Sequence, residues 1–223
     1  MSSNLTQKKL LRIVVLDTGF TKSPTSRVKL CKDGSKDFTG RGLEDNQGHG
    51  SHIANIIADR ISPKLNYCII IVKWYDTDQD SSVSVEERTL KSFEYIATLK
   101  DITAVNYSAG GPGEFVPERD AVRSVTVSNT KVFVSAGNNS HNLDKDCNFF
   151  PACYNIHNLN VIGLLDKNGK HHKLSNYGKI VTQWENGVDV LADAGSKGII
   201  YLTGTSQATA IATSKYINSL GKK

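Results

Sequence analysis

Short runs of aliphatic residues alternate along the chain with longer stretches in which apolar side chains recur at helical spacing. The short runs cover residues 12–16, 67–73, 103–107 and 131–135, and they predict buried strands. The longer stretches cover residues 49–61, 83–99 and 117–127, and they predict amphipathic helices. Because strand and helix alternate in this order, the pattern predicts an α/β protein of three layers, with helices on both faces of a mostly parallel sheet.

The second half of the chain is less regular. Short apolar runs at residues 160–164, 179–182, 188–191 and 199–202 predict further strands. Gly204, Thr205 and Ser206 then open a final helix, which we expect to continue to Leu220. No internal repeat, linker or low-complexity block interrupts the sequence, so we expect residues 1–223 to form a single domain.

Composition and charge exclude several classes of protein. Hydrophobic residues make up 39% of the chain and charged residues 22%, which is typical of a globular domain and not of a disordered one. The net charge is +5, but the 27 Lys and Arg residues are scattered among 22 Asp and Glu, so we expect no nucleic acid as a partner. No apolar run approaches the roughly 20 residues of a membrane span, and we recognise no secretory signal. We therefore expect no membrane association and a cytoplasmic location.

The four cysteines are Cys31, Cys68, Cys147 and Cys153, and they form no C-x-x-C pair. Without a secretory signal, the default expectation is reduced thiols, as in most cytoplasmic proteins. Cys147 and Cys153 are close enough in the sequence to form a bridge if the compartment is oxidising.

Three groups suited to nucleophilic catalysis lie at the ends of predicted elements. Asp17 follows the first strand, His49 begins a helix, and Ser206 begins the last helix. A serine hydroxyl is a poor nucleophile unless an imidazole takes its proton, and the imidazole needs a carboxylate to fix its tautomer. Each residue alone is ordinary at such a position, so it is their combination that indicates catalysis.

Five motifs carry a resemblance to a known family. They are VVLDTG at 14–19, GHGSHIANIIA at 48–58, NYSAGGPG at 106–113, VFVSAGNN at 132–139 and GTSQATA at 204–210. In this order they resemble the Asp, His, substrate-cleft, oxyanion and Ser motifs of the subtilisin-like serine proteases. The resemblance spans nearly the whole chain. It implies a subtilisin-like fold and a serine endopeptidase that acts on protein or peptide substrates without a cofactor.

The resemblance also implies roles for individual residues. His49 would act as general base and then general acid, Asp17 would orient it, and Ser206 would attack the scissile carbonyl. The side-chain amide of Asn138 and the backbone N–H of Ser206 would stabilise the oxyanion. Two segments would form the walls of the pocket for the substrate residue before the cut: Ser108, Ala109 and Gly110 on one side, and Ser135, Ala136 and Gly137 on the other.

We expect no metal site. His52 lies one helical turn after His49, but no Glu stands between them as in the HExxH pattern, so we interpret His52 as a packing residue behind the site. The segment 58–67, where the family commonly carries a calcium loop, is short and holds Asp59 as its one carboxylate.

Other mechanisms and another class of function remain as alternatives. Asp17-Thr18-Gly19 is also the aspartic-protease signature, but that chemistry needs a second such motif, which this sequence lacks. Residues 204–208 fail the G-x-S-x-G pattern of α/β-hydrolases at its last position. A different class is a non-catalytic pseudoprotease module that binds peptides in the same cleft, or one that a partner activates.

Substrate preference and regulation stay open at this level. Asp144 and Asp146 follow Asn138 in the sequence, and they could favour a basic residue before the cut or be solvated loop charges. A separate inhibitor or an activating partner is among the ways in which a cell could restrain such an enzyme.

Overall fold

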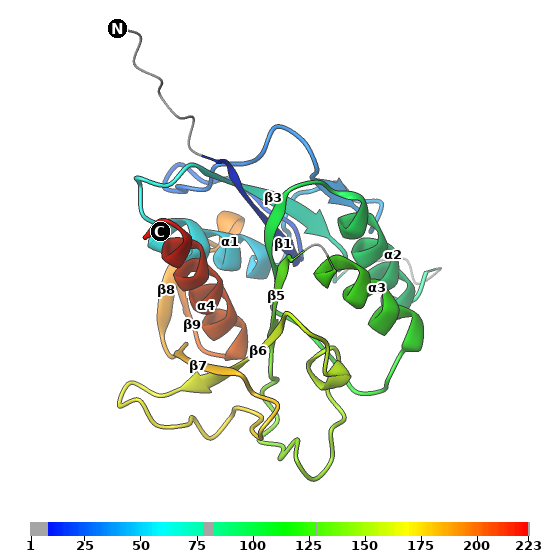
Figure 1. Ribbon diagram of the computed structural model, residues 1–223. Helices are drawn as coiled ribbons and strands as arrows, with labels where there is room; N and C mark the ends of the chain where they lie inside the picture. The colour runs from blue at the N-terminus through cyan, green and yellow to red at the C-terminus, as the bar shows by residue number, and fades with distance from the viewer. Residues whose placement is uncertain (1–8, 78–82, 128, 223) are drawn as a thin grey trace, which may run out of the picture.

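The computed structural model describes residues 9–77, 83–127 and 129–222, and within these residues seven strands form one parallel sheet in the order β2-β3-β1-β4-β5-β6-β7. The strands are β1 (Leu11–Asp17), β2 (Lys36–Asp37), β3 (Tyr67–Lys73), β4 (Ile102–Tyr107), β5 (Lys131–Ser135), β6 (Leu159–Leu165) and β7 (Gln183–Asn186), followed by the separate antiparallel pair β8 (Val190–Asp193) and β9 (Ile199–Leu202). The helices are α1 (His49–Arg60), α2 (Val85–Thr98), α3 (Val116–Thr126) and α4 (Thr205–Leu220), with 3-10 turns at Ala152–Tyr154 and Gly195–Lys197. Helices α1 and α4 cover one face of the sheet and α2 and α3 the other, so the predicted three layers are confirmed (Figure 1).

The central strands bury both of their faces, which is why their sequences are continuous apolar runs. In β1, Ile13 and Val15 pack in one cluster with side chains of α1 and α4. Val14 and Leu16 pack in a second cluster with side chains of α2 and α3. All four side chains are fully buried. The single strand β1 therefore contributes to two hydrophobic cores, one on each side of the sheet.

The order of the strands reverses at β1, which lies between β3 and β4. The chain passes from β1 through α1 to β3 on one side of it, and then from β3 through α2 to β4 on the other side. Because the strands are parallel, their carboxyl ends lie at one edge of the sheet, and ligands of such sheets bind where the order reverses. Asp17 ends β1, Ser108 directly follows β4, and Ser135 ends β5.

The strand predicted at 179–182 is wrong, since β7 begins at Gln183. Residues 178–181 form a turn closed by the hydrogen bond from Val181 N to Gly178 O, 3.1 Å long. Val181 is nevertheless buried in a core cluster, so its apolar character reflects packing and not a strand. The strand predicted at 188–191 lies at Val190–Asp193. The helix predicted at 83–99 is α2, which begins at Val85 and is capped by Ser84, whose side chain accepts the Glu87 N–H.

The expectation of reduced thiols is also wrong, because Cys31 is bonded to Cys68 and Cys147 to Cys153. The first pair is 37 residues apart in the sequence, and only the fold places Cys31 next to β3, where its N–H donates to Ile69 O. The reduced thiols were expected because the sequence shows no secretory signal, and the cytoplasmic location that rests on the same observation stays a prediction that these disulfides do not favour. None of the described helices combines the length and the apolar character that crossing a membrane requires.

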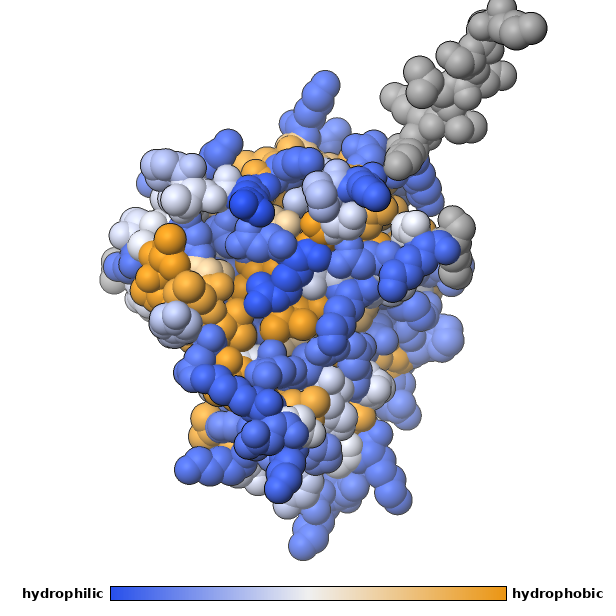
Figure 2. Space-filling model, turned by 90° about the vertical axis from the view of Figure 1, so that its left-hand side faces the viewer, coloured by the Kyte–Doolittle hydropathy of each residue, from blue (hydrophilic) through white to orange (hydrophobic). Residues whose placement is uncertain are grey.

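The surface on the side of α1, α4 and β8 is mixed (Figure 2). Hydrophilic side chains dominate it, and apolar patches lie between them. Among the described residues, large apolar side chains that are well exposed include Leu191 of β8 and Ile199 and Tyr201 of β9.

Candidate active site

The predicted catalytic residues come from four elements that meet at the carboxyl edge of the sheet. Asp17 is the last residue of β1, and His49 is the first residue of α1. Ser206 is the second residue of α4, and Asn138 lies three residues after the end of β5. Hydrogen bonds join Asp17 to His49, Ser206 to Ser108, and Asn138 to Thr205.

Asp17 and His49 form a hydrogen-bonded pair. His49 Nδ1 lies 2.7 Å from Asp17 Oδ1, and the same oxygen accepts the Thr18 N–H at 2.8 Å. The Asp17 side chain is 3% exposed and that of His49 is 28% exposed, so the pair lies at the base of an accessible site. With Nδ1–H donating to the carboxylate, the neutral ring keeps Nε2 as its proton acceptor. Burial lowers the pKa of His49, but the charge of Asp17 and its hydrogen bond outweigh burial, and the pKa is raised.

Asp45 and Thr18 fix the start of α1, and the sequence analysis did not single them out. The Asp45 carboxylate is 1% exposed and accepts the N–H groups of Gly48 and Ser51, each at 2.7 Å. Thr18 Oγ1 donates to Asp45 Oδ1 at 2.9 Å and accepts the Gly50 N–H at 2.8 Å. These amides are the ones that a helix leaves without internal partners. Asp45 thus positions His49, and a carboxylate four residues before the first residue of the helix was the signal that could have indicated it.

Ser206 and Ser108 are hydrogen-bonded to each other. Ser206 Oγ donates to Ser108 O at 2.9 Å, and Ser108 Oγ donates to Ser206 O at 3.0 Å. Ser108 Oγ accepts from Asn106 Nδ2 at 2.8 Å, and Asn106 Oδ1 accepts from Thr213 Oγ1 at 3.0 Å. Since the Ser206 hydroxyl is directed at Ser108 O, its hydrogen must turn toward His49 before the ring can accept it. Catalytic hydrogen bonds of this kind often form only with substrate bound.

The Asn138 side chain has one fixed orientation. Its Oδ1 accepts the backbone N–H of Thr205 at 2.9 Å and the hydroxyl of the same residue at 3.1 Å. A backbone N–H can only donate, so the atom facing it is the oxygen, which removes the usual ambiguity between the oxygen and nitrogen of an amide. The Nδ2 group is therefore directed away from Thr205, and Asn138 is exposed. Its geometry suits a donor to a substrate oxygen next to the start of α4.

The two predicted pocket walls are neighbours in space. Ser135 Oγ donates to Ala109 O at 3.2 Å, which links the segment after β5 to the segment after β4. Ala136 O accepts from Asn176 Nδ2 at 2.8 Å. Gly137 has a φ of 97°, a conformation that glycine adopts without strain. The hydrogen bond between Ser135 and Ala109 thus places the segment 108–110 beside the segment 135–137.

The remaining candidates of the sequence analysis have structural partners. His52 is fully buried, and its Nε2 lies 3.1 Å from Val190 O and 3.2 Å from Ile200 O, as expected for a packing residue. Burial lowers the pKa of His52. Asp144 is exposed and its Oδ1 accepts the Lys179 N–H at 2.8 Å. In the described part of the chain, no group of three or more His, Cys, Asp or Glu side chains is placed to hold a metal ion.

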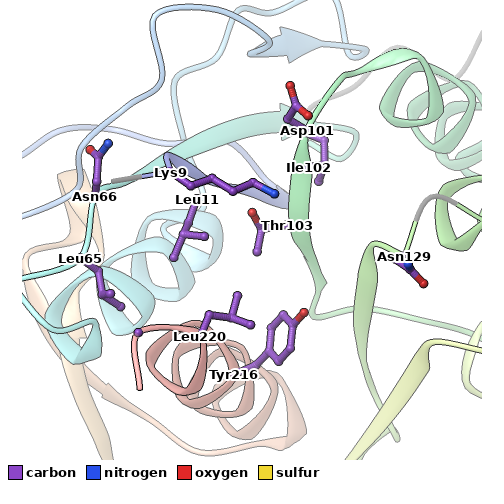
Figure 3. A pocket seen from close by; sticks show the side chains of 11 residues that line it. Lys9, Leu11, Leu65, Asn66, Asp101, Ile102, Thr103, Asn129, Tyr216 and Leu220 are labelled. Atoms are coloured by element: carbon purple, nitrogen blue, oxygen red, sulfur yellow. The ribbon is translucent and has the colours of Figure 1, made fainter. Parts of the chain in front are cut away.

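A cavity away from the predicted site lies at the other edge of the sheet. It has a volume of about 640 Å³ and is lined by residues at the amino ends of β1 and β4, among them Leu11 and Ile102, together with Tyr216 and Leu220 of α4 (Figure 3). The carboxyl end of β1, which carries Asp17, is at the opposite edge of the sheet. None of the predicted site residues lines this cavity.

Comparisons with known proteins place the chain in a family. The model of the Subtilase family (peptidase S8) matches residues 8–216. The chain is 26% identical over 202 residues to subtilisin DY of Bacillus licheniformis, covering 89% of this chain and 72% of that protein. It is also 26% identical over 216 residues to the major intracellular serine protease of Bacillus subtilis (strain 168), covering 90% of this chain and 65% of that protein.

Solved structures show the same fold. A cold-adapted subtilisin-like serine proteinase aligns with a TM-score of 0.76 at 19% identity, covering 96% of this chain and 76% of that chain. MycP1 with its propeptide removed aligns with a TM-score of 0.71 at 22% identity, covering 92% of this chain and 76% of that chain. The parallel sheet with its flanking helices is the subtilisin-like fold. With a family model that matches nearly all of its length, the chain belongs to the subtilase family of serine proteases.

Proposed function

We propose that this chain is a serine endopeptidase that hydrolyses peptide bonds through an acyl-enzyme. Asp17, His49 and Ser206 form the catalytic triad, and Asn138 is the side-chain oxyanion donor. The observation that carries the proposal is the 2.7 Å hydrogen bond between His49 Nδ1 and Asp17, which prepares Nε2 as a base at the edge that also holds Ser206. The chain spans 72% and 65% of the two curated relatives, so an activity for the whole protein is itself part of the proposal.

The chemical steps follow from the positions of these groups. His49 Nε2 accepts the hydroxyl proton as Ser206 Oγ bonds to the scissile carbonyl carbon, and the carbonyl electrons move onto its oxygen. Asn138 Nδ2 and the Ser206 N–H donate to that oxyanion, which is where negative charge develops. The protonated His49, stabilised by Asp17, then gives its proton to the leaving amine. A water molecule repeats the sequence on the acyl-enzyme and restores Ser206.

The substrate binds as an extended strand beside residues 108–110. Gly111 already exchanges two hydrogen bonds with Phe150, from Gly111 N to Phe150 O at 3.0 Å and from Phe150 N to Gly111 O at 2.7 Å. Because the polar groups of successive residues in an extended strand point to opposite sides, those of Gly110 face away from Phe150. A peptide that adds to this free side brings its scissile bond to Ser206.

A non-catalytic, peptide-binding module is the second candidate. The observation that favours it is the direction of the Ser206 hydroxyl, which donates to Ser108 O and not to His49. In this second case the same cleft holds a peptide without cleaving it, and an activating partner supplies the change that turns the hydroxyl. No cofactor is proposed, and the partners are a protein or peptide substrate and a separate inhibitor or activator.

A fluorophosphonate probe distinguishes the two candidates. The probe bonds covalently to a serine only when the serine is activated by its base. We expect stoichiometric labelling of the parent protein and none of Ser206→Ala, with Ser219→Ala, at the far end of the same helix, labelled like the parent. Absence of labelling in folded parent protein, together with peptide binding, supports the module instead.

A further inference from the structure

One aromatic ring lies between the two glycines of the proposed pocket walls. A Cβ atom built on Gly110 would lie 2.6 Å from Cε1 and 2.9 Å from Cζ of Phe149. A Cβ atom built on Gly137 would lie 2.9 Å from both Cε2 and Cζ of the same ring. The outer edge of the Phe149 ring therefore touches both walls at once, and neither glycine tolerates a side chain while the ring is there.

The proposed catalytic groups indicate which part of the substrate enters the space between the segments 108–110 and 135–137. Ser206 Oγ is 2.9 Å from Ser108 O. A substrate carbonyl carbon bonded to Ser206 Oγ therefore lies beside the start of the 108–110 segment. Asn138, which would hold the oxygen of this carbonyl, directly follows Gly137. The substrate residue before the cut therefore directs its side chain between the two segments. That is the direction in which the Phe149 ring lies.

The loop that carries Phe149 is held on several sides. The disulfide between Cys147 and Cys153 closes it, and Cys153 N donates to Phe149 O at 3.0 Å. Asn148 Oδ1 accepts the Gly113 N–H at 2.8 Å, which ties the loop to the predicted substrate strand. The Phe150 ring points elsewhere and packs on Tyr154, with 5.0 Å between ring centroids. Phe149 itself is half-buried. The disulfide and the two hydrogen bonds hold the backbone that carries its ring.

We propose that Phe149 fills the inner part of the pocket for the substrate residue before the scissile bond and restricts that residue to small side chains, such as Gly, Ala or Ser. This inference rests on the proposed function. A basic preference set by Asp144 does not fit this arrangement, because the Asp144 carboxylate accepts the Lys179 N–H and the ring closes the pocket before any long side chain could extend. A pocket filled by an aromatic ring rejects bulk by steric exclusion, which is stronger than the modest discrimination of a spacious apolar pocket.

The test compares peptides that differ only in the residue before the cut, with Ala, Leu, Phe or Arg at that position. For the parent protein we expect kcat/KM to be at least about 100-fold higher for the Ala peptide than for the Phe peptide. Phe149→Gly should raise kcat/KM for the Phe peptide by about 100-fold and change the Ala peptide by less than about fivefold. Phe150→Leu is the matched control, since it alters the neighbouring ring, and we expect it to keep the preference of the parent.

The inference would be overturned by a parent protein that cleaves the Phe or Arg peptide as fast as the Ala peptide, or by a folded Phe149→Gly protein that still rejects large residues. Phe149→Ala is the second variant should glycine loosen the loop, and melting curves report on folding. The same peptides titrated into Ser206→Ala by fluorescence anisotropy test the pocket without catalysis, where equal affinity for small and large residues contradicts the proposal. Absence of fluorophosphonate labelling in the parent, by contrast, counts against the proposed function and leaves this binding comparison to decide the inference.

Discussion

Ser206 and Ser108 are joined by two hydrogen bonds that run in opposite directions, each from a hydroxyl to the other residue's carbonyl oxygen. One residue lies on the last helix and the other follows a central strand, 98 positions earlier in the sequence. Neutral hydrogen bonds contribute about 0.5–1.5 kcal/mol each to stability. The proposed nucleophile is therefore held against the segment that would bind substrate, and the two cannot shift independently.

Ser206→Ala should remove turnover and leave the fold intact. The variant loses only the bond from Ser206 Oγ, since the bond from Ser108 Oγ uses the backbone of residue 206. We expect a loss of about 1 kcal/mol in the free energy of unfolding. In subtilisin, loss of the nucleophile costs about 10⁶ in kcat, and we expect a similar loss here. Initial rates and denaturant unfolding measure both effects, and a rate within about tenfold of the parent would contradict the assignment of Ser206.

Asn138→Ala should lower kcat and leave KM nearly unchanged. The Nδ2 group acts on the oxyanion and only weakly on the ground-state carbonyl, and the equivalent donor of subtilisin contributes about 10²–10³ in kcat. Some loss of stability is expected too, because Asn138 Oδ1 accepts the Thr205 N–H at the start of α4. Asn139→Ala, at the next exposed position, is the control and should behave like the parent. A defect confined to KM would argue against the oxyanion role.

The sequence alone predicted the location of a residue wherever an apolar pattern defines an element and the residue lies at the end of that element. The apolar run of β1 predicts a strand buried on both faces, and Asp17 at its end predicts a side chain at the carboxyl edge. Position alone could then bring Asp17 near His49, because α1 starts at the same edge. The order of the motifs predicted that Ser206, far along the chain, also lies at this edge, where α4 begins.

Contacts between distant segments were beyond the sequence. Cys31 and Cys68 are 37 residues apart and meet only because residues 30 and 31 run beside β3. Asp45 reaches the amides of α1 through a loop whose shape no periodic pattern encodes. Phe149 is one aromatic residue among several in its loop, and its position between Gly110 and Gly137 follows from strand pairing and not from composition.

Activity should rise with pH, with a midpoint above 6.5, the usual pKa of a histidine. His49 must be neutral to accept the serine proton, and Asp17 raises its pKa by stabilising the charged ring, although burial opposes this. The same shift means that protonated His49 stabilises the fold fully below the unfolded pKa, and that this contribution is lost as pH rises through the folded pKa. Asp17→Asn should move the midpoint of kcat/KM to lower pH. A profile that is flat from pH 5 to 8 would contradict the role of His49.

Reducing agent should lower the melting temperature. In the chain-entropy description, the Cys31–Cys68 disulfide, with a sequence separation of 37, contributes about 4 kcal/mol to the free energy of unfolding. Cys147–Cys153, with a separation of 6, contributes about 2 kcal/mol. For a chain of this size we expect full reduction to lower Tm by about 10–20 °C.

Melting curves of two double variants separate the disulfides, and Cys31→Ser with Cys68→Ser should show the larger loss. A shift below about 3 °C on reduction would mean that the thiols are free in solution, as the sequence alone suggested.

Helix α4 packs on α1 and on the strands at the centre of the sheet, and it carries the proposed nucleophile. A ribosome makes the chain from its N-terminus, so β1 and α1 emerge long before residues 205–220, and domains fold in the order in which they become available. The proposed base, His49, is therefore synthesised well before the serine that it would activate. Under the proposed function, peptide-bond cleavage must therefore wait until residue 206 has been made and α4 has packed against the sheet, and nascent neighbours on the same message are not cut before then.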